Sequence, residues 1–176
     1  MRIVSGSLGG RIFASPHGHR THPMSDKMRG ALFNMLGDIR GLSVLDPFAG
    51  SGALCFEAVS RGSGRVVAVE QDKKAQRTIT ENIESLGLEG KVELFSAPAK
   101  GWFNRKRDTF DILLLDPPYD DLQYNLIEKL AERTVSGGRL VLSWPGGDRD
   151  LPRFPDYELL TNKQYGDASL RVYRRN

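Results

Sequence analysis

The chain has 176 residues, of which 39% are hydrophobic and 27% are charged, the composition of a globular protein with a substantial hydrophobic core. It shows no apolar run of membrane-spanning length and no signal-peptide pattern at its start, so we expect a cytoplasmic protein with no membrane partner. The single cysteine, Cys55, excludes an internal disulfide framework and a cysteine-rich zinc site, and no other metal-ligand cluster is evident.

Basic residues are concentrated at the start of the chain, although the net charge of the whole is only +3. Within residues 1–29 a single acid, Asp26, stands against five basic residues and three histidines: Arg2, Arg11, Arg20, Lys27, Arg29, His17, His19 and His22. A basic arm of this kind suits contact with phosphate groups. The charge pattern alone also fits a solvated hairpin that has no partner.

The chain is expected to open with a glycine-rich hairpin. Residues 2–5 and 11–14 read as two short strands, and residues 15–23, with two prolines and a glycine, read as a loop. We therefore expect a small N-terminal β-hairpin extension, the basic arm, over residues 1–24. One larger domain is predicted over residues 25–176.

A helix is predicted over residues 26–36. Ser25 can cap it, and Asp26 occupies the first turn, where a negative charge is favoured. Gly30 falls in the middle of this helix and costs about 1 kcal/mol relative to alanine.

The rest of the chain alternates strands with helices. Strands are predicted at residues 43–45, 65–69, 92–95, 110–115, 139–143, 157–160 and 168–173. Helices are predicted at residues 53–61, 73–86 and 123–133, with a short helix through Trp102. This order favours an α/β fold with a right-handed, mostly parallel seven-stranded sheet, and the final two strands favour an antiparallel pair at one edge.

A nucleotide-binding arrangement follows the strand at residues 43–45. Asp46 ends the strand, and Gly50 and Gly52 precede a helix whose first amides are open to a ligand. The third glycine of a dinucleotide motif would fall at Cys55 and is absent, and we expect Cys55 to be a small buried hydrophobic residue. Asp46 would repel a pyrophosphate, so it favours a ligand with a positive end.

Glu70 ends the next strand, 20 residues after Gly50. A carboxylate at this place can accept hydrogen bonds from both hydroxyls of a ribose. Taken alone, it could equally be an exposed carboxylate at the start of a helix. A ribose-bearing, phosphate-free and cationic ligand is S-adenosylmethionine rather than NAD.

The sequence Asp116-Pro117-Pro118-Tyr119 follows the apolar run at residues 110–115. Two prolines end the strand abruptly because neither can donate a hydrogen bond to the sheet. The Asp116 carboxylate, the Pro117 carbonyl and the Tyr119 ring should lie on a stiff turn at the carboxyl end of the strand, where open α/β sheets bind ligands. Two acceptors beside an aromatic ring suit a planar base with an exocyclic amino group.

These motifs together resemble class I methyltransferases that methylate amino groups. More narrowly, the chain resembles the RsmD family, bacterial methyltransferases that modify the N2 amine of a guanine in 16S ribosomal RNA. The motif Asp116 to Tyr119 is shared with DNA adenine methyltransferases. The match includes residues 2–11, 21–34 and 44–54, and the N-terminal hairpin joined to residues 23–34 singles out the RsmD family.

The resemblance implies a Rossmann-like class I methyltransferase fold, S-adenosyl-L-methionine as cofactor, and 16S ribosomal RNA or a small-subunit assembly intermediate as partner of a monomer. The implied cofactor contacts are Asp46, Phe48, Gly50, Gly52, Glu70, Gln71, Ala97 and Asp116, with Pro23, Ser25 and Asp26 closing over the cofactor. The implied catalytic residues are Asp116, Pro117 and Tyr119. The expected RNA contacts are Arg2, Arg11, Arg20, His22, Lys27 and Arg29.

The chain departs from the family pattern at four positions. His22, Met24 and Gly30 stand where the family usually has arginine, threonine and glutamate. Ala97 lies near the place of an aspartate that would hold the adenine amine.

Three other functions are weighed against this one. An N6-adenine DNA methyltransferase uses the same motif, although this chain has no spare residues for a target-recognition insertion. A non-catalytic RNA-binding assembly factor could keep the same fold. A dehydrogenase is disfavoured by the missing third glycine.

Overall fold

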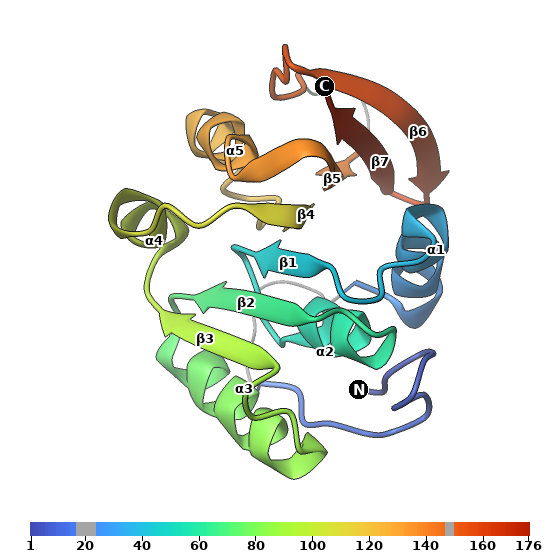
Figure 1. Ribbon diagram of the computed structural model, residues 1–176, viewed down its shortest axis with the longest axis vertical. Coiled ribbons are helices and arrows are strands. Elements are labelled where there is room, and N and C mark those ends of the chain that lie inside the picture. The colour runs from blue at the N-terminus through green and yellow to red at the C-terminus, as the bar shows by residue number, and fades with distance from the viewer. Residues whose placement is uncertain (17–23, 147–149) are drawn as a thin grey trace.

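Seven strands form one sheet in the order β3-β2-β1-β4-β5-β7-β6 in the computed structural model, which describes residues 1–16, 24–146 and 150–176 (Figure 1). The strands are β1 (Ser43–Asp46), β2 (Arg65–Glu70), β3 (Val92–Ser96), β4 (Phe110–Leu115), β5 (Thr134–Pro145), β6 (Tyr157–Tyr165) and β7 (Ala168–Arg175). The first five strands are parallel to one another, and β7 runs antiparallel to both β5 and β6. The predicted α/β fold and its antiparallel pair at one edge are confirmed, with β6 as the outermost strand.

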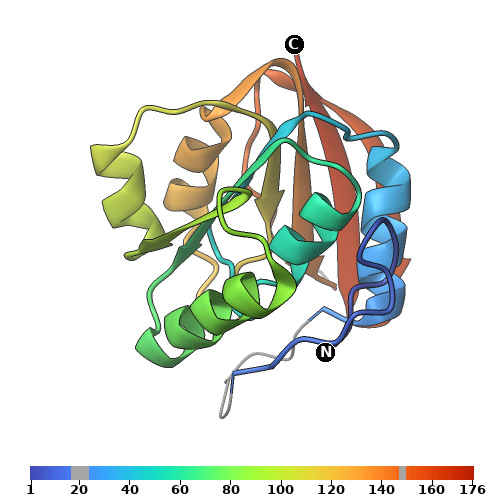
Figure 2. The same ribbon diagram turned by 60° about the horizontal axis from the view of Figure 1, so that its bottom comes forward.

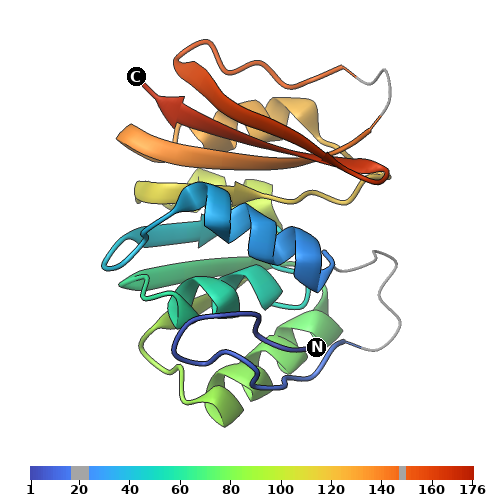
Figure 3. The same ribbon diagram turned by 90° about the vertical axis from the view of Figure 1, so that its right-hand side faces the viewer.

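Helices cover both faces of the sheet. They are α1 (Asp26–Leu36), α2 (Ala53–Ser60), α3 (Lys73–Leu86), α4 (Ala99–Arg105) and α5 (Tyr124–Ala131). Figures 2 and 3 show α1, α2 and α3 on one side of the sheet, and α4 and α5 on the other. A parallel sheet needs this arrangement because the crossover helices bury both of its faces.

Alternate residues of each central strand belong to different hydrophobic clusters. Val44 and Ile112 pack with the side chains of α1, α2 and α3, whereas Leu45 and Leu113 pack with those of α4 and α5. This follows from the two-residue period of a strand, which points successive side chains to opposite faces. The apolar runs that mark these strands in the sequence therefore supply two separate cores.

Local signals set the ends of the helices. The Ser25 hydroxyl accepts a hydrogen bond from the Met28 amide over 3.2 Å and caps α1, as predicted. Asp72 caps α3 in the same way, and α3 ends at Gly87 in the left-handed conformation. Gly30 does not interrupt α1, and a Cβ at this position would lie 3.4 Å from the Val4 side chain.

The last three strands of the chain are longer than predicted, β7 by two residues and β5 and β6 by more. The structure begins β5 at Thr134, whereas the sequence suggested a start at residue 139, because Gly137 and Gly138 indicate a turn. A Cβ on Gly138 would lie 2.9 Å from the Asp111 carbonyl oxygen, so this glycine permits close approach of two strands. In β6, the prediction ended at residue 160 because the strand is largely exposed and lacks apolar alternation.

The predicted N-terminal hairpin is only partly formed. Residues 1–16 pair through a single antiparallel bridge, Arg2 with Ile12, so the two four-residue strands expected there are wrong. Ile3 and Phe13 are buried in the same cluster as α1, α2 and α3, and the Phe13 ring meets the Phe56 ring edge-on at 5.1 Å. Figure 3 shows this segment lying over α2 and α3. The arm is thus held by side-chain burial and by hydrogen bonds to α2 and α3, with only limited pairing between its own two halves.

Within the three described ranges, no helix is long and apolar enough to cross a membrane. Across the same ranges, no group of three or more histidine, cysteine, aspartate or glutamate residues is placed to hold a metal ion. The predicted boundary at residue 24 adjoins residues outside the described part of the chain and stays a prediction.

Candidate active site

Three carboxylates follow three neighbouring parallel strands. Asp46 ends β1, Glu70 ends β2, and Asp116 comes directly after β4. Because parallel strands share one direction, their carboxyl ends meet at one edge of the sheet. Asp116 and Glu70 both raise the pKa of Asp46 through their negative charge, so the three groups lie close enough to interact. The sequence-predicted residues are thereby brought together.

The glycine turn after β1 needs its glycines for conformational reasons. Gly50 and Gly52 have φ angles of 54° and 78°, in the left-handed region. A Cβ on Gly52 would also lie 2.8 Å from atoms of the Phe56 ring. The backbone of the turn therefore lies close to the edge of the sheet, where α2 begins.

Glu70 ties this turn to the end of β2. One carboxylate oxygen accepts a hydrogen bond from the Gly50 amide and the other from the Asp72 amide, each over 2.7 Å. A carboxylate oxygen has two lone pairs. Each oxygen of Glu70 thus keeps the capacity to accept a further bond from a ligand hydroxyl.

Asp46 is a buried carboxyl group with a strongly shifted pKa. Burial raises the pKa of Asp46 to about 7, opposed by a hydrogen bond from the Phe48 amide at 3.2 Å and reinforced by the charge of Asp116. The Cys55 thiol lies 3.5 Å from the carboxylate and donates to it. A ligand with a positive group would favour the ionised form of Asp46.

Cys55 itself is fully buried, as predicted for a small hydrophobic residue. Burial, followed by the nearby Asp46, raises the pKa of the Cys55 thiol well above its ordinary value. A thiol held protonated in this way is a poor nucleophile.

Asp116 and Tyr119 are joined through a residue that the sequence analysis did not identify. The hydroxyls of Tyr119 and Ser143 lie 2.7 Å apart, and the Ser143 hydroxyl is close enough to the Asp116 carboxyl to act on its pKa. Burial raises the pKa of Asp116, and the Ser143 hydroxyl lowers it. Burial likewise raises the pKa of Tyr119 to about 12, so the phenol keeps its proton at neutral pH.

Comparison with known proteins covers nearly the whole chain. The family model described as "Conserved hypothetical protein 95" matches residues 1–174. A Bacillus subtilis protein named as a candidate rRNA methyltransferase, YlbH, is 31% identical over 99% of this chain and 99% of its own. The chain belongs to the RsmD family.

Two further relatives of the family come from Escherichia coli. Ribosomal RNA small subunit methyltransferase D of strain K12 is 28% identical over 99% of this chain and 90% of its own. A solved structure described as a candidate methyltransferase, YhhF, superposes with a TM-score of 0.89 at 28% identity, covering 100% of this chain and 98% of the other. The N-terminal arm is therefore part of the region shared within the family.

The arm residues expected to contact RNA fall into different environments. The Arg2 side chain is 65% exposed and pairs with Asp26 at 2.7 Å, and Lys27 is exposed. Arg11 is exposed as well, but its guanidinium donates hydrogen bonds to carbonyls at the end of α3. Arg20, His22 and Pro23 lie outside the described residues.

The structure corrects the prediction that Arg29 contacts RNA. Its side chain is 0% exposed, so its guanidinium is not available to a phosphate. It pairs with Asp26 at 2.7 Å, lies 3.6 Å from the Glu57 carboxylate and donates a hydrogen bond to the Arg2 carbonyl. The positive charge that looked like part of a basic arm instead joins the arm to α1.

Glu57 is the buried partner in this network. Its carboxylate accepts hydrogen bonds from the amides of Val4 and Ser5 and pairs with Arg61 at 2.8 Å. The signal for it in the sequence is a glutamate in the middle of the otherwise apolar helix α2. A charge among apolar residues on a buried helix requires a partner.

The remaining residues predicted to bind the cofactor stay predictions. Phe48 is half-buried, Gln71 is exposed, and the Ala97 amide donates to the Glu70 carbonyl over 3.0 Å. Ser25 and Asp26 are engaged in capping α1 and in ion pairs with Arg2 and Arg29.

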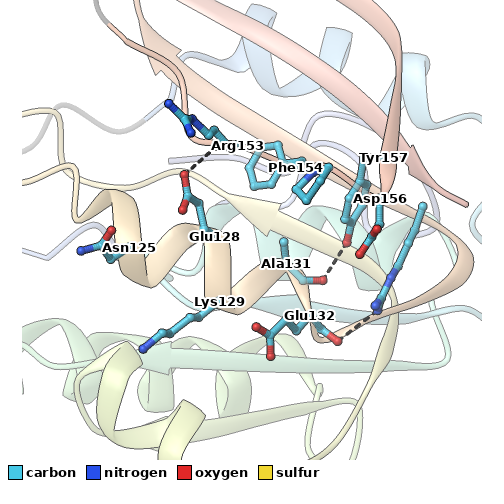
Figure 4. A pocket seen from close by; sticks show the side chains of 11 residues that line it. Asn125, Glu128, Lys129, Ala131, Glu132, Arg153, Phe154, Asp156 and Tyr157 are labelled. Carbon is cyan, nitrogen blue, oxygen red and sulfur yellow. Dashed lines mark hydrogen bonds between the residues drawn. The ribbon is translucent and has the colours of Figure 1, made fainter.

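A cavity of about 470 Å³ lies elsewhere, between α5 and the segment leading into β6 (Figure 4). Its charged groups have both signs and are partly engaged: Glu128 accepts a hydrogen bond from the Arg153 amide, and Arg175 donates one to the Glu132 carbonyl. It shares no lining residue with the candidate active site. We therefore assign it no part in the chemistry.

Proposed function

We propose that this protein transfers the methyl group of S-adenosylmethionine to the exocyclic N2 amine of a guanine in 16S ribosomal RNA. Membership of the RsmD family supports methyl transfer to ribosomal RNA. The observation that carries the proposal is the meeting of Asp46, Glu70 and Asp116 at one edge of the sheet. A donor site and an acceptor site adjoin there.

The residues of the donor site fit S-adenosylmethionine. Asp46 is a buried carboxylate that a cationic ligand would keep ionised, and Glu70 retains acceptor capacity for the ribose hydroxyls. The turn through Gly50 and Gly52 allows close approach of the ligand. We assign Phe48, Gln71 and Ala97 to the adenine side of the site, and Pro23, Ser25 and Asp26 to its cover.

S-adenosylmethionine supplies an already activated methyl group, so the chief work of this chain is to place the acceptor amine in line with it. The N2 lone pair of guanine is delocalised into its ring and is a weak nucleophile. The Asp116 carboxylate and the Pro117 carbonyl can accept the two N–H bonds of the amine and favour a pyramidal nitrogen. Asp116 can then take the proton released, or stabilise the developing charge.

Tyr119 supplies the stacking surface. The guanine must leave its helix or loop to reach the site, a step that costs a few kcal/mol and that stacking on an aromatic ring partly offsets. The raised pKa of Tyr119 keeps the phenol neutral, so it does not act as a base at neutral pH. Tyr119 therefore positions the base, and Asp116 acts on the amine.

The arm is assigned to RNA docking. Arg2 and Arg11 are exposed on it, Lys27 is exposed in the first turn of α1, and Arg20 and His22 complete the proposed set. The partner is 16S ribosomal RNA or a small-subunit assembly intermediate, and the enzyme acts as a monomer in the cytoplasm, where ribosomes are assembled.

The test is methyl transfer from labelled cofactor to small-subunit ribosomal RNA, to assembled particles and to duplex DNA, with mass mapping of the product nucleoside. We expect N2-methylguanosine on RNA or particles and none on DNA. Label on an adenine of DNA would instead establish the N6-adenine activity. An absence of transfer to all three substrates would favour a non-catalytic assembly factor.

The role of Asp116 is tested with Asp116→Ala. This variant should nearly abolish turnover while cofactor binding, measured by calorimetry, persists. Retention of more than about a tenth of the wild-type rate, a loss of under about 1.4 kcal/mol, would show that the assigned role is wrong.

A further inference from the structure

Ser143 lies beside the acceptor motif on the neighbouring strand. In the parallel pairing of β4 with β5, Leu115 is opposite Leu142, so the next residue on each strand brings Asp116 alongside Ser143. The Ser143 side chain is buried, with the residue 2% exposed. Its hydroxyl lies 2.7 Å from that of Tyr119, and it is close enough to the Asp116 carboxyl to lower the pKa of that group.

The chemistry of the three groups sets the direction of these hydrogen bonds. When Asp116 is ionised its carboxylate can only accept, so a hydrogen bond between the two groups uses the single proton of the Ser143 hydroxyl. In that arrangement the Tyr119 hydroxyl is the donor to Ser143. The result is a chain of two bonds that runs from the phenol through the serine to the carboxylate, and such chains strengthen each member.

Strand formation does not require this hydroxyl. The backbone of Ser143 is paired in the sheet opposite Leu170 of β7, and its chain neighbours Leu142 and Trp144 are buried apolar residues. A buried hydroxyl is costly unless it is hydrogen-bonded. The Ser143 hydroxyl has its hydrogen-bond partner in Tyr119 and lies beside Asp116, the two residues assigned to the acceptor base.

We propose that Ser143 is a positioning residue for methyl transfer, holding the Asp116 carboxylate toward the acceptor amine and the Tyr119 ring against the base. The inference rests on the proposed function, since it assigns a role to Ser143 through Asp116 and Tyr119. Ser143 acts before the reaction by selecting one orientation of each group. It touches neither the methyl group nor the amine.

The experiment compares Ser143→Ala with Ser143→Thr, which keeps the hydroxyl. Ser143→Ala should lower kcat by about 10- to 100-fold, the effect of removing a hydrogen bond to a charged group. The cofactor Kd should change by less than about twofold, because the donor site is untouched. Ser143→Thr should recover most of the lost kcat.

A pH–rate profile separates positioning from a general loss of structure. Ser143 lowers the pKa of Asp116, so its removal should move the acid limb of the profile to higher pH. Ser169→Ala is the matched control: it removes a hydroxyl that is equally buried but bonds to the Trp144 carbonyl on the neighbouring strand. The control should leave the acid limb in place.

Tyr119→Phe provides a variant that leaves β5 intact, whatever the stability of the Ser143 variants. It removes the first bond of the chain, so the acid limb should again move upward, by a smaller amount. In a double-mutant cycle, the effects of Ser143→Ala and Tyr119→Phe on kcat should be less than additive. Strict additivity, or no shift of the limb in Tyr119→Phe, would overturn the inference.

Asp116→Ala, measured in parallel, distinguishes a failure of the proposed function from a failure of the inference about Ser143. If Asp116→Ala keeps its activity, the proposed function of that residue is wrong and the role of Ser143 fails with it. If Asp116→Ala is inactive while Ser143→Ala matches wild type or Ser169→Ala, only the inference about Ser143 is wrong.

Discussion

Glu70 accepts a hydrogen bond from the Gly50 amide over 2.7 Å and so joins the end of β2 to the glycine turn after β1. The two residues are 20 positions apart in the chain. The same carboxylate accepts from the Asp72 amide at the start of α3. The residue assigned to the cofactor ribose is therefore also the one that shapes the turn beneath the cofactor.

Replacement of Glu70 by glutamine should weaken cofactor binding by at least about 10-fold. In glutamine, an NH2 group replaces one of the two carboxylate oxygens, and it cannot accept a hydrogen bond from a backbone amide. One bond to a charged acceptor is therefore lost, and the turn is loosened. Isothermal titration calorimetry measures the affinity. Glu93→Gln is the control, because Glu93 pairs with Arg65 at the surface; equal affinities in both variants would contradict the assignment.

Cofactor affinity should rise with pH up to about pH 7 and then level off. Burial raises the pKa of Asp46 from its ordinary 3.8 to about 7, so Asp46 is largely protonated below that pH in the free protein. A cationic ligand needs the ionised form, and binding below pH 7 must release a proton. Calorimetry in buffers of different ionisation enthalpy measures this release, which Asp46→Asn should remove together with much of the affinity.

The raised pKa of Asp46 also affects the stability of the folded chain. Its contribution to stability falls with pH, whereas cofactor affinity rises. Between pH 4 and pH 7, Asp46 binds a proton more strongly in the folded chain than in the unfolded one. Its contribution to stability therefore falls as pH rises through this window. Without cofactor, Asp46→Asn should gain thermal stability relative to wild type at pH 8 and lose that advantage at pH 4; a constant difference in Tm would refute the shift.

Replacement of Arg29 by methionine should destabilise the protein by about 3–5 kcal/mol, because it leaves Glu57 buried with fewer compensating charges. Arg29 also bonds the Arg2 carbonyl, so the arm should become more susceptible to proteolysis. Chemical denaturation and limited proteolysis measure the two effects. Arg40→Ala breaks an exposed pair with Asp38 and should leave both nearly unchanged.

Replacement of the exposed Lys27 by glutamine should reduce the salt dependence of RNA binding. Each phosphate contact removed lowers the slope of log K against log salt by about one. Filter binding or fluorescence anisotropy at several salt concentrations gives the slope. Arg174→Gln, on β7 and paired with Glu158, is the control; if Lys27→Gln behaves like the control, Lys27 does not contact RNA.

Much of the fold could be predicted because its determinants are local. Capping by Ser25, the stop at Gly87 and the apolar runs of the central strands lie within a few residues of the structures they set. The failures also have local causes. Gly137 and Gly138 indicate a turn, yet both lie inside β5. The neighbouring strand leaves no room for a side chain at Gly138, and Gly137 has a φ of 76°, which favours glycine.

Part of the candidate site could likewise be predicted from the sequence, and part could not. Asp46, Glu70 and Asp116 could be placed together from the sequence, because each follows a strand and parallel strands end at one edge. The burial of Arg29 could not be predicted, because an arginine in a basic segment usually faces water. The role of Ser143 was hidden too, since a serine within an apolar strand carries no signal of its partner.

The sequence by itself determined the order of the strands and helices, the turns between them and the chemical groups at the strand ends. Those features depend on periodicity and on backbone preferences within a few residues. Only the tertiary structure decided that Glu57 holds the arm 53 residues earlier and that Ser143 reaches Tyr119 24 residues away. Such contacts arise from the register of the sheet and the packing of its helices, which bring together groups that no short stretch of sequence contains.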